Sequence, residues 1–304
     1  MSALVDLSKL TPPKVLEELN FEALLAERKS AFIALYPESE QPFWQARLSL
    51  ESEPITKLLE ENCYMQLLER QRINNAAQAT MLAYATGSDL DVIAANFNVE
   101  RKVIQVADNQ VIPPIEEVLE TDTALRTRVQ LAFEGLSVAG PRGAYIFHAL
   151  SAHVNVADVS VISPQPAYVT VTILSNIDRG VANDDILNAV RKALNDDNVR
   201  PIGDRVTVQS AVISTYEIRA KLYLYKGPEY EPIKQSALIN LQQYVSEKHR
   251  LGRDISLSGI YSALHVEGVQ KVELLNPTND IIIEPHQAGF CTNIQLDVVI
   301  SDDY

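Results

Sequence analysis

The sequence has 304 residues, of which 46% are apolar and 22% are charged, a balance typical of a globular protein long enough for two or three domains. Its 40 acidic and 26 basic residues give a formal net charge of −14, which disfavours nucleic acid and anionic membranes as partners because both need a positive surface. No stretch is apolar over a bilayer's thickness, and residues 1–11 lack the basic region and apolar core of a secretory leader. The sequence therefore predicts neither nucleic-acid binding nor direct membrane insertion.

The first hundred residues predict helices only. Pro12 and Pro13 suit the first turn of one helix, which Pro37 stops, and a second helix is expected at about residues 42–50. Pro54 then opens a long helix with two different halves. Its first turns spread apolar residues over a wide arc, which predicts neighbours on more than one side, and its later turns carry a single stripe, which predicts one buried face. The wide arc comprises Ile55, Leu58, Leu59, Cys63, Met65, Leu67 and Leu68, and the stripe comprises Ile73, Ala76, Ala77, Thr80, Met81 and Tyr84.

A sharp break is predicted at Gly87, which stands where a left-handed residue often ends a helix. Ser88 or Asp89 is expected to cap a second, short helix with Leu90 on its apolar face and Asn98 at its end. Asp89 and Asp91 could be interpreted as a metal pair, but carboxylates in a first helical turn are favoured by the helix dipole alone, and the structural interpretation is preferred.

The pattern changes after Arg101. Extended residues lead to Pro113 and Pro114, and a helix capped by Asp122 follows and ends at the glycines 135 and 140. Pro141 opens another helix. Alternating residues at 154–161 and 169–173 predict a hairpin, followed by a helix capped by Asn183 and a strand at 206–208.

Residues 213–225 begin a second module that repeats this theme, in which a strand, a helix and further strands follow one another. The predicted fold is α+β, with an N-terminal all-helical region followed by two α+β sandwich modules. The expected domains are residues 1–101, 102–210 and 211–304. The segment 143–161 also resembles 259–274, each a helix leading into a strand, although this periodicity alone can produce such a likeness.

A search for chemistry finds no catalytic, cofactor or metal site. Phosphate-loop, dinucleotide, zinc-protease, calcium-loop and serine-nucleophile motifs are all absent. His148 and His153 are five residues apart, so they do not share a helical face, and surface or capping roles are expected for the histidines. Cys63 and Cys291 have no metal spacing and are interpreted as small apolar residues in a reducing compartment.

Several motifs, in order along the chain, resemble the baseplate J-like proteins of contractile-tailed phages, and most closely their members from P2-type phages and pyocin-like particles. The run from Gly87 to Asp91, with Ile93-Ala94 and Val99-Glu-Arg101, is similar to one family signature. Further matches are Glu120-Thr-Asp122, Leu125-Arg126-Thr-Arg128-Val129, Gly140 to Tyr145, Arg200-Pro201 and Asp204-Arg-Val206-Thr-Val208. Larger relatives carry a β-rich insertion where only about residues 102–120 are available here, so no function of that insertion is transferred.

The resemblance implies a non-enzymatic baseplate wedge subunit in the virion tail, assembled in the host cytoplasm and linking the central hub to the sheath and tail fibres. The implied partners are a second copy in each wedge, a gpI-like wedge protein and a gpW-like sheath initiator. Together with the apolar pattern it places a subunit contact on the first half of the long helix, with Ile55, Leu58, Leu59, Met65 and Leu68 as candidates. The alternatives are an envelope-degrading tail hydrolase, which would need a convergent acid, base or nucleophile, and a generic cytoplasmic adaptor.

Overall fold

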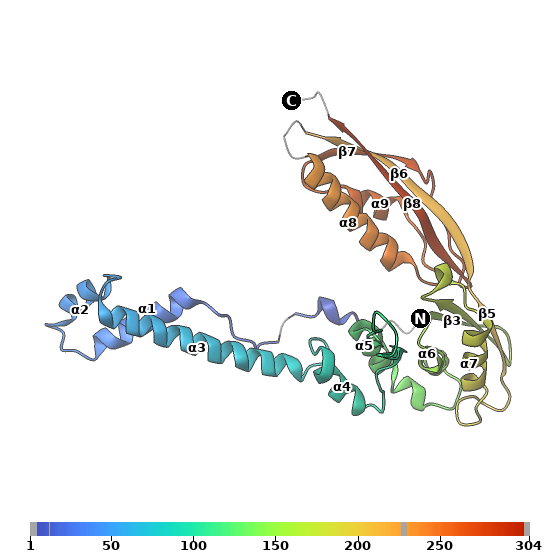
Figure 1. Cartoon of the computed structure of the whole chain (residues 1–304), viewed down its shortest axis with the longest axis horizontal. Coiled ribbons are helices and arrows are strands. Elements are labelled where there is room, and N and C mark those ends of the chain that lie inside the picture. The colour runs from blue at the N-terminus through green and yellow to red at the C-terminus, as the bar shows by residue number, and fades with distance from the viewer. Residues whose placement is uncertain (1–4, 12, 226–229, 301–304) are drawn as a thin grey trace. The chain divides into compact units, whose positions relative to one another are not determined.

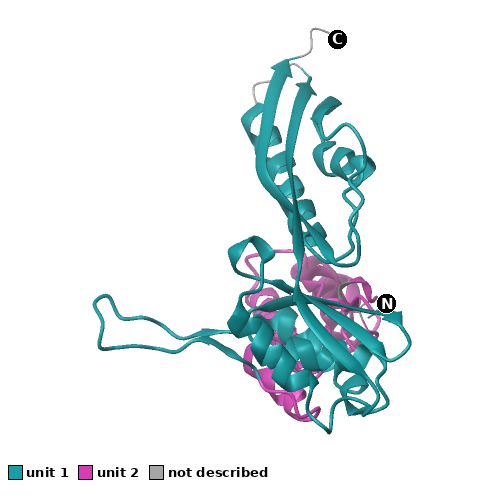
Figure 2. Cartoon of the chain, turned by 90° about the vertical axis from the view of Figure 1, so that its right-hand side faces the viewer, with its two compact units in different colours: residues 1–2, 101–304 teal, residues 3–100 magenta. Residues whose placement is uncertain are grey.

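The computed structural model describes residues 5–11, 13–225 and 230–300 (Figure 1). The chain divides into two compact units, residues 3–100 and residues 101–304 (Figure 2). The described part of the first unit is helical, and the second unit combines helices with strands. This confirms the predicted α+β class with an all-helical N-terminal region.

The first unit differs from its prediction at the start. Helix α1 begins at Phe21 rather than at the prolines. The side-chain carbonyl of Asn20 accepts a hydrogen bond from the Ala23 N–H at 3.0 Å and caps the helix there. The residues between Pro13 and the Asn20 cap are not helical, and Pro12 lies outside the described residues. Pro54 opens the long helix as predicted. The elements of this unit are η1 (Leu7–Lys9), α1 (Phe21–Ala34), α2 (Gln41–Leu48), α3 (Pro54–Ala79) and α4 (Gly87–Ala95).

The break between α3 and α4 is also built differently. Helix α3 already ends at Ala79, where the Thr80 hydroxyl donates to the Ala77 carbonyl at 2.8 Å and competes with the helical hydrogen bonds. Gly87, with φ of +53°, is the first residue of α4, and the cap position belongs to Thr86 rather than to Ser88 or Asp89. Helix α4 ends at Ala95, before the predicted Asn98. Asn98 has φ of +56° in the turn that follows, and the Val99 N–H donates to the Ala94 carbonyl.

The second unit begins with a two-stranded ribbon and a three-stranded sheet. Strand β3 pairs antiparallel with β4 as the predicted hairpin, and β4 pairs parallel with β5 after the crossover through α7. Asn183 caps α7 as predicted, accepting the Ile186 N–H bond at 3.0 Å. The α5 cap is Thr121 instead of Asp122, whose carboxylate is engaged by Arg101. The elements are β1 (Val103–Gln105), β2 (Val118–Leu119), α5 (Asp122–Leu131), η2 (Glu134–Leu136), α6 (Arg142–Ala152), β3 (Val156–Gln165), β4 (Tyr168–Ser175), η3 (Asp178–Gly180), α7 (Asp184–Leu194) and β5 (Arg205–Ser210).

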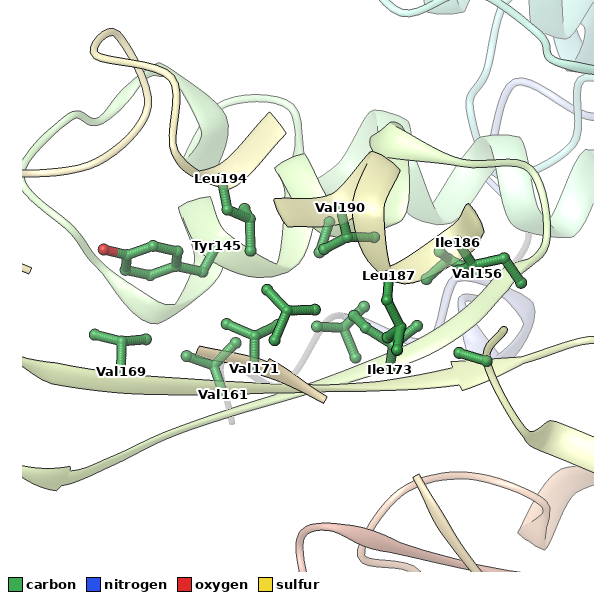
Figure 3. Close-up of a cluster of buried hydrophobic side chains, with 14 residues drawn as sticks. Tyr145, Val156, Val161, Val169, Val171, Ile173, Ile186, Leu187, Val190 and Leu194 are labelled. Atoms are coloured by element: carbon green, nitrogen blue, oxygen red, sulfur yellow. The ribbon is translucent and has the colours of Figure 1, made fainter. Parts of the chain in front are cut away.

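Helices α6 and α7 cover one face of this central sheet. Figure 3 shows Tyr145 of α6 and Val190 of α7 directed toward the strand residues, among them Val171 of β4. The alternation that predicted the hairpin arises because every second strand residue faces these helices. The core of the central module therefore lies between the two helices and the sheet.

The C-terminal sheet has the strand order β7-β6-β8 within the described residues. Its central strand β6 pairs antiparallel with β7 and parallel with β8, and α8 and α9 contribute to the core on its inner face. The central sheet has the same pairing around β4, but there the helix–strand pair α6–β3 precedes the central strand, whereas α9–β7 follows it. The elements are β6 (Val212–Leu224), α8 (Tyr230–Lys248), α9 (Leu257–Leu264), β7 (Val269–Asn276) and β8 (Gln287–Ile300).

The two sheets of the second unit join at Ala211, the single residue between β5 and β6. Ala211 belongs to a buried apolar cluster with Leu174, Leu251 and Ala288. Beside the cluster, the carboxylate of Asp158 on β3 accepts the Leu251 N–H bond at 2.9 Å and the Val159 N–H bond at 3.0 Å. Burial raises the pKa of Asp158 above its ordinary value. The junction is thus fixed by apolar packing and by a carboxylate that reaches from one module to the other.

Candidate subunit interface

One face of α3 packs against α1 inside the helical unit. Leu24 and Leu25 of α1 are buried with Cys63 of α3, and Phe21 and Leu59 pack against them. Farther along the same face, the Arg28 guanidinium donates to the Gln66 side-chain carbonyl at 2.6 Å. Leu59, Cys63 and Gln66 are four and three residues apart, so they share one face of the helix.

Asn74 continues this face and fixes the chain before α1. Its side-chain amide donates to the Glu17 carbonyl at 2.9 Å and its carbonyl accepts the Glu17 N–H bond at 3.1 Å. The predicted apolar stripe is therefore partly wrong: Ile73, Ala76 and Thr80 are exposed, whereas Ala77, Met81 and Tyr84 are half-buried. A buried asparagine that pairs with the main chain replaces the expected apolar contact, and apolar periodicity cannot reveal it.

The opposite face of α3 carries apolar side chains that are exposed in the described part of the chain. Leu58, Met65 and Leu68 are 59%, 50% and 44% exposed. At about 100° per residue these three positions share an arc on the side away from the α1 contact. Of the other two candidate interface residues, Ile55 and Leu59 are half-buried, and Leu59 already packs against α1. The structure thus leaves three of the five candidates open to a partner, and the interface itself stays a prediction.

The residues of the helix-break motif serve the local fold. Leu90 is buried, Asp89 is exposed in the first turn of α4, and the Asp89 N–H donates to the Thr86 carbonyl at 3.2 Å. Among the described residues, no three His, Cys, Asp or Glu side chains are grouped so that they could hold a metal ion. Gly87 and Leu90 mark a turn and a core position.

Other family motifs meet at the base of the β1–β2 ribbon. The Glu120 carboxylate accepts from Arg128 Nε at 2.9 Å and from Arg128 Nη2 at 2.5 Å, and both side chains are buried. Arg101 pairs with Asp122 at 2.7 Å and donates to the Glu120 carbonyl at 2.6 Å. Three motif segments that are separate in the sequence therefore form one ion-pair network.

Two further motifs meet beside the central sheet. The Tyr145 hydroxyl donates to Asp204 Oδ2 at 2.6 Å, and burial, followed by this hydrogen bond, holds the pKa of Tyr145 above its ordinary value. Gly140 has φ of +77°, and a Cβ there would lie 2.8 Å from Cγ of Pro201. A side chain at Gly140 would therefore be both strained and obstructed.

Lys102 gives the ribbon base a pH dependence. Its ammonium donates to the Leu150 carbonyl at 2.6 Å, near the end of α6, and burial, followed by the nearby Arg128, lowers the pKa of Lys102 to about 8. The unfolded chain then binds more protons than the folded chain between pH 8 and pH 10.5, so this group makes stability rise with pH across that window. We expect the unfolding free energy of the natural protein, minus that of Lys102→Met, to increase from pH 8 to pH 10.5 in denaturant titrations. A pH-independent difference would contradict this expectation.

The histidines that make hydrogen bonds contact the main chain instead of a reactive group. His148 Nε2 lies 3.0 Å from the Gly135 carbonyl, His249 Nδ1 lies 2.7 Å from the Gly289 carbonyl, and His153 Nδ1 accepts the Asn155 N–H bond. Across residues 5–11, 13–225 and 230–300, no helix has the length and apolar character to cross a bilayer. The hydrogen bonds of these histidines therefore connect segments of the second unit.

Comparison with known proteins shows which family the chain belongs to. Residues 51–108 match the Baseplate J-like N-terminal domain, residues 137–210 the Baseplate J-like central domain and residues 216–297 the Baseplate J-like protein C-terminal domain. The chain belongs to the baseplate J-like family. It is 56% identical over 300 residues to Baseplate protein J of Escherichia phage P2, covering 99% of each chain. A chain in the cryo-EM structure of the anti-feeding prophage baseplate is similar at a TM-score of 0.40 and 13% identity, over 64% of this chain and 48% of that chain.

The family and this relative establish a structural protein of a phage baseplate, located in the tail of the virion. Its motif residues can now be assigned to the fold. Arg101, Glu120, Asp122 and Arg128 form one cluster, and Gly140, Tyr145 and Asp204 form another. Sequence reasoning identified these motifs but not their contacts.

Proposed function

We propose that this chain is a baseplate wedge subunit that joins a second copy of itself, a gpI-like wedge protein and a gpW-like sheath initiator. In this role it is needed for baseplate assembly and links the central hub to the sheath and tail fibres of a contractile tail. The observation that carries the proposal is the outer face of α3, where Leu58, Met65 and Leu68 are exposed although the opposite face is packed. Exposed apolar side chains that share a helix face favour a helical partner.

The proposal includes a domain for each task. Residues 1–101 supply the helical contact, and residues 102–210 and 211–304 supply two sheet modules. Assembly takes place in the host cytoplasm before the tail is complete. The chain acts without catalysis, in contrast to an envelope-degrading tail hydrolase, and its partners in the baseplate distinguish it from a generic adaptor.

The test replaces Leu58 and Leu68 with Ala together. In an assembled helix bundle each truncation should remove on the order of 2 to 5 kcal/mol, and much less in the isolated chain, where both side chains are exposed. We expect loss of copurification with the co-expressed baseplate proteins, together with unchanged unfolding of the helical unit. Trp44, the sole tryptophan, lies in α2 and reports that unfolding by fluorescence.

Leu35→Ala with Leu50→Ala is the matched control, because these leucines of the same unit are also exposed and lie outside α3. The control should retain every partner. Equal loss of partners in both double variants would contradict a specific α3 interface, and a lowered stability of the Leu58 and Leu68 variant would show that these residues support the fold instead.

A further inference from the structure

The β1–β2 ribbon leaves its apolar side chains uncovered. Among the described residues, β1 and β2 form a two-stranded sheet, and all their residues are exposed. Figure 2 shows the ribbon projecting from the rest of its unit. The exposed apolar side chains of the ribbon are Val103, Ile104, Val106, Val111, Ile112, Val118 and Leu119.

The base of the ribbon is fixed to α5, whereas the hydrogen bonds of its outer part lie within the ribbon itself, among them the one that the Gln110 N–H donates to Asp108 Oδ1 at 2.8 Å. Glu120 binds Arg128 and also accepts the Lys102 N–H bond at 3.1 Å, which clamps both strands to α5. Farther out, Asp108 and Ile115 exchange two main-chain hydrogen bonds of 2.9 Å. Two-stranded ribbons are at best marginally stable in water, so a ribbon of this kind gains stability when another surface covers it.

The charge of the ribbon limits what can cover it. Asp108, Glu116 and Glu117 lie between Val103 and Leu119, and the same segment has no Lys, Arg or His. An anionic lipid surface or a nucleic acid would be repelled. A basic border is not readily supplied by a second copy of this chain, because the chain has 40 acidic and 26 basic residues, whereas the apolar α3 contact needs no such border.

We propose that residues 103–119 form a docking arm that inserts into an apolar groove bordered by Lys or Arg on a different protein subunit of the baseplate. The inference rests on the baseplate role and is separate from the α3 interface. The branched side chains fill the groove, the three carboxylates pair with the basic border, and the free strand edges supply main-chain hydrogen bonds. The clamp at Glu120 presents the arm in a fixed direction, which reduces the entropy lost on docking.

The proposal is tested by placing a photo-crosslinking benzoyl-phenylalanine at Ile112, which is 98% exposed, in assembled tail particles. We expect a covalent product with another baseplate subunit, and mass spectrometry should locate the bond in an apolar segment flanked by Lys or Arg. The control carries the same residue at Ile202, which is 100% exposed and lies outside the ribbon. Cross-linking to a second copy of this chain, or no product above the Ile202 control, would overturn the docking arm.

Charge reversal separates this arm from the α3 contact. Glu116→Lys with Glu117→Lys should weaken docking about tenfold or more, because two like charges are then placed against the basic border. Glu267→Lys, an exposed position outside the ribbon, should leave docking unchanged. Unchanged assembly of the double variant, together with loss of partners for Leu58→Ala with Leu68→Ala, would reject the arm alone. If mass spectrometry of complete, unaltered tail particles did not detect this chain, the wedge role itself would be rejected.

Discussion

Glu120→Ala is expected to destabilise the second unit by about 3 to 5 kcal/mol, because it leaves the Arg128 guanidinium buried without its carboxylate. Glu120 and Arg128 are joined by two hydrogen bonds and are both almost inaccessible to water. The change also removes the acceptor of the Lys102 N–H bond. Unfolding in guanidinium, followed by circular dichroism, measures the loss.

The matched control is the double variant Glu120→Gln with Arg128→Met, which removes both charges and retains most of the volume. Buried ion pairs can often be replaced by neutral groups at little cost, so the double variant should recover a large part of the lost stability. If it is as unstable as Glu120→Ala, the loss comes from packing or from the Lys102 contact instead of the broken Glu120–Arg128 ion pair.

Leu222→Ala should cost about 2 to 5 kcal/mol, the usual effect of a cavity in a core that cannot collapse. Leu222 is fully buried near the end of β6, in the core formed with α8 and α9. The same unfolding experiment measures the effect.

Lys221→Ala is its neighbour on the opposite face of the strand and should change stability by no more than about 0.5 kcal/mol. The contrast tests which face of the C-terminal sheet is inward. Similar losses for the two variants would mean that the sheet is covered on both faces.

Local sequence signals are sufficient for the hairpin of the second unit and for the start of α7, but not for the cap of α5, which is Thr121 instead of Asp122. Val159 and Ile173 belong to alternating stretches that form the predicted hairpin, and Asn183 caps α7, because both signals depend on neighbouring residues. The start of α1 was misplaced because a proline pair and an asparagine cap are both valid signals for a helix start. Only the hydrogen bond that the Ala23 N–H donates to the Asn20 side-chain carbonyl shows which signal starts the helix.

The polar contacts were beyond sequence reasoning for a different reason. Asn74 contacts Glu17, and Arg128 contacts Glu120, but nothing in the spacing of these residues indicates that they meet. The family motifs placed Arg101 and Glu120 in separate segments, and only the folded chain brings them together. The subunit contact predicted on α3 stays a prediction: of its candidates, Leu58, Met65 and Leu68 are exposed, whereas Leu59 packs against α1, because one helical position separates the inner and outer faces.

The parallel pairing of β6 and β8 has a mechanical consequence. The two strands remain paired from Val212 with Gln287 to Leu224 with Ile300. A tension applied between Val212 and Ile300 would pull along both strands, so the hydrogen bonds of the whole ladder would share the load instead of opening one by one. The C-terminal sheet is therefore oriented to transmit a pulling force into the central module through Ala211 without peeling apart.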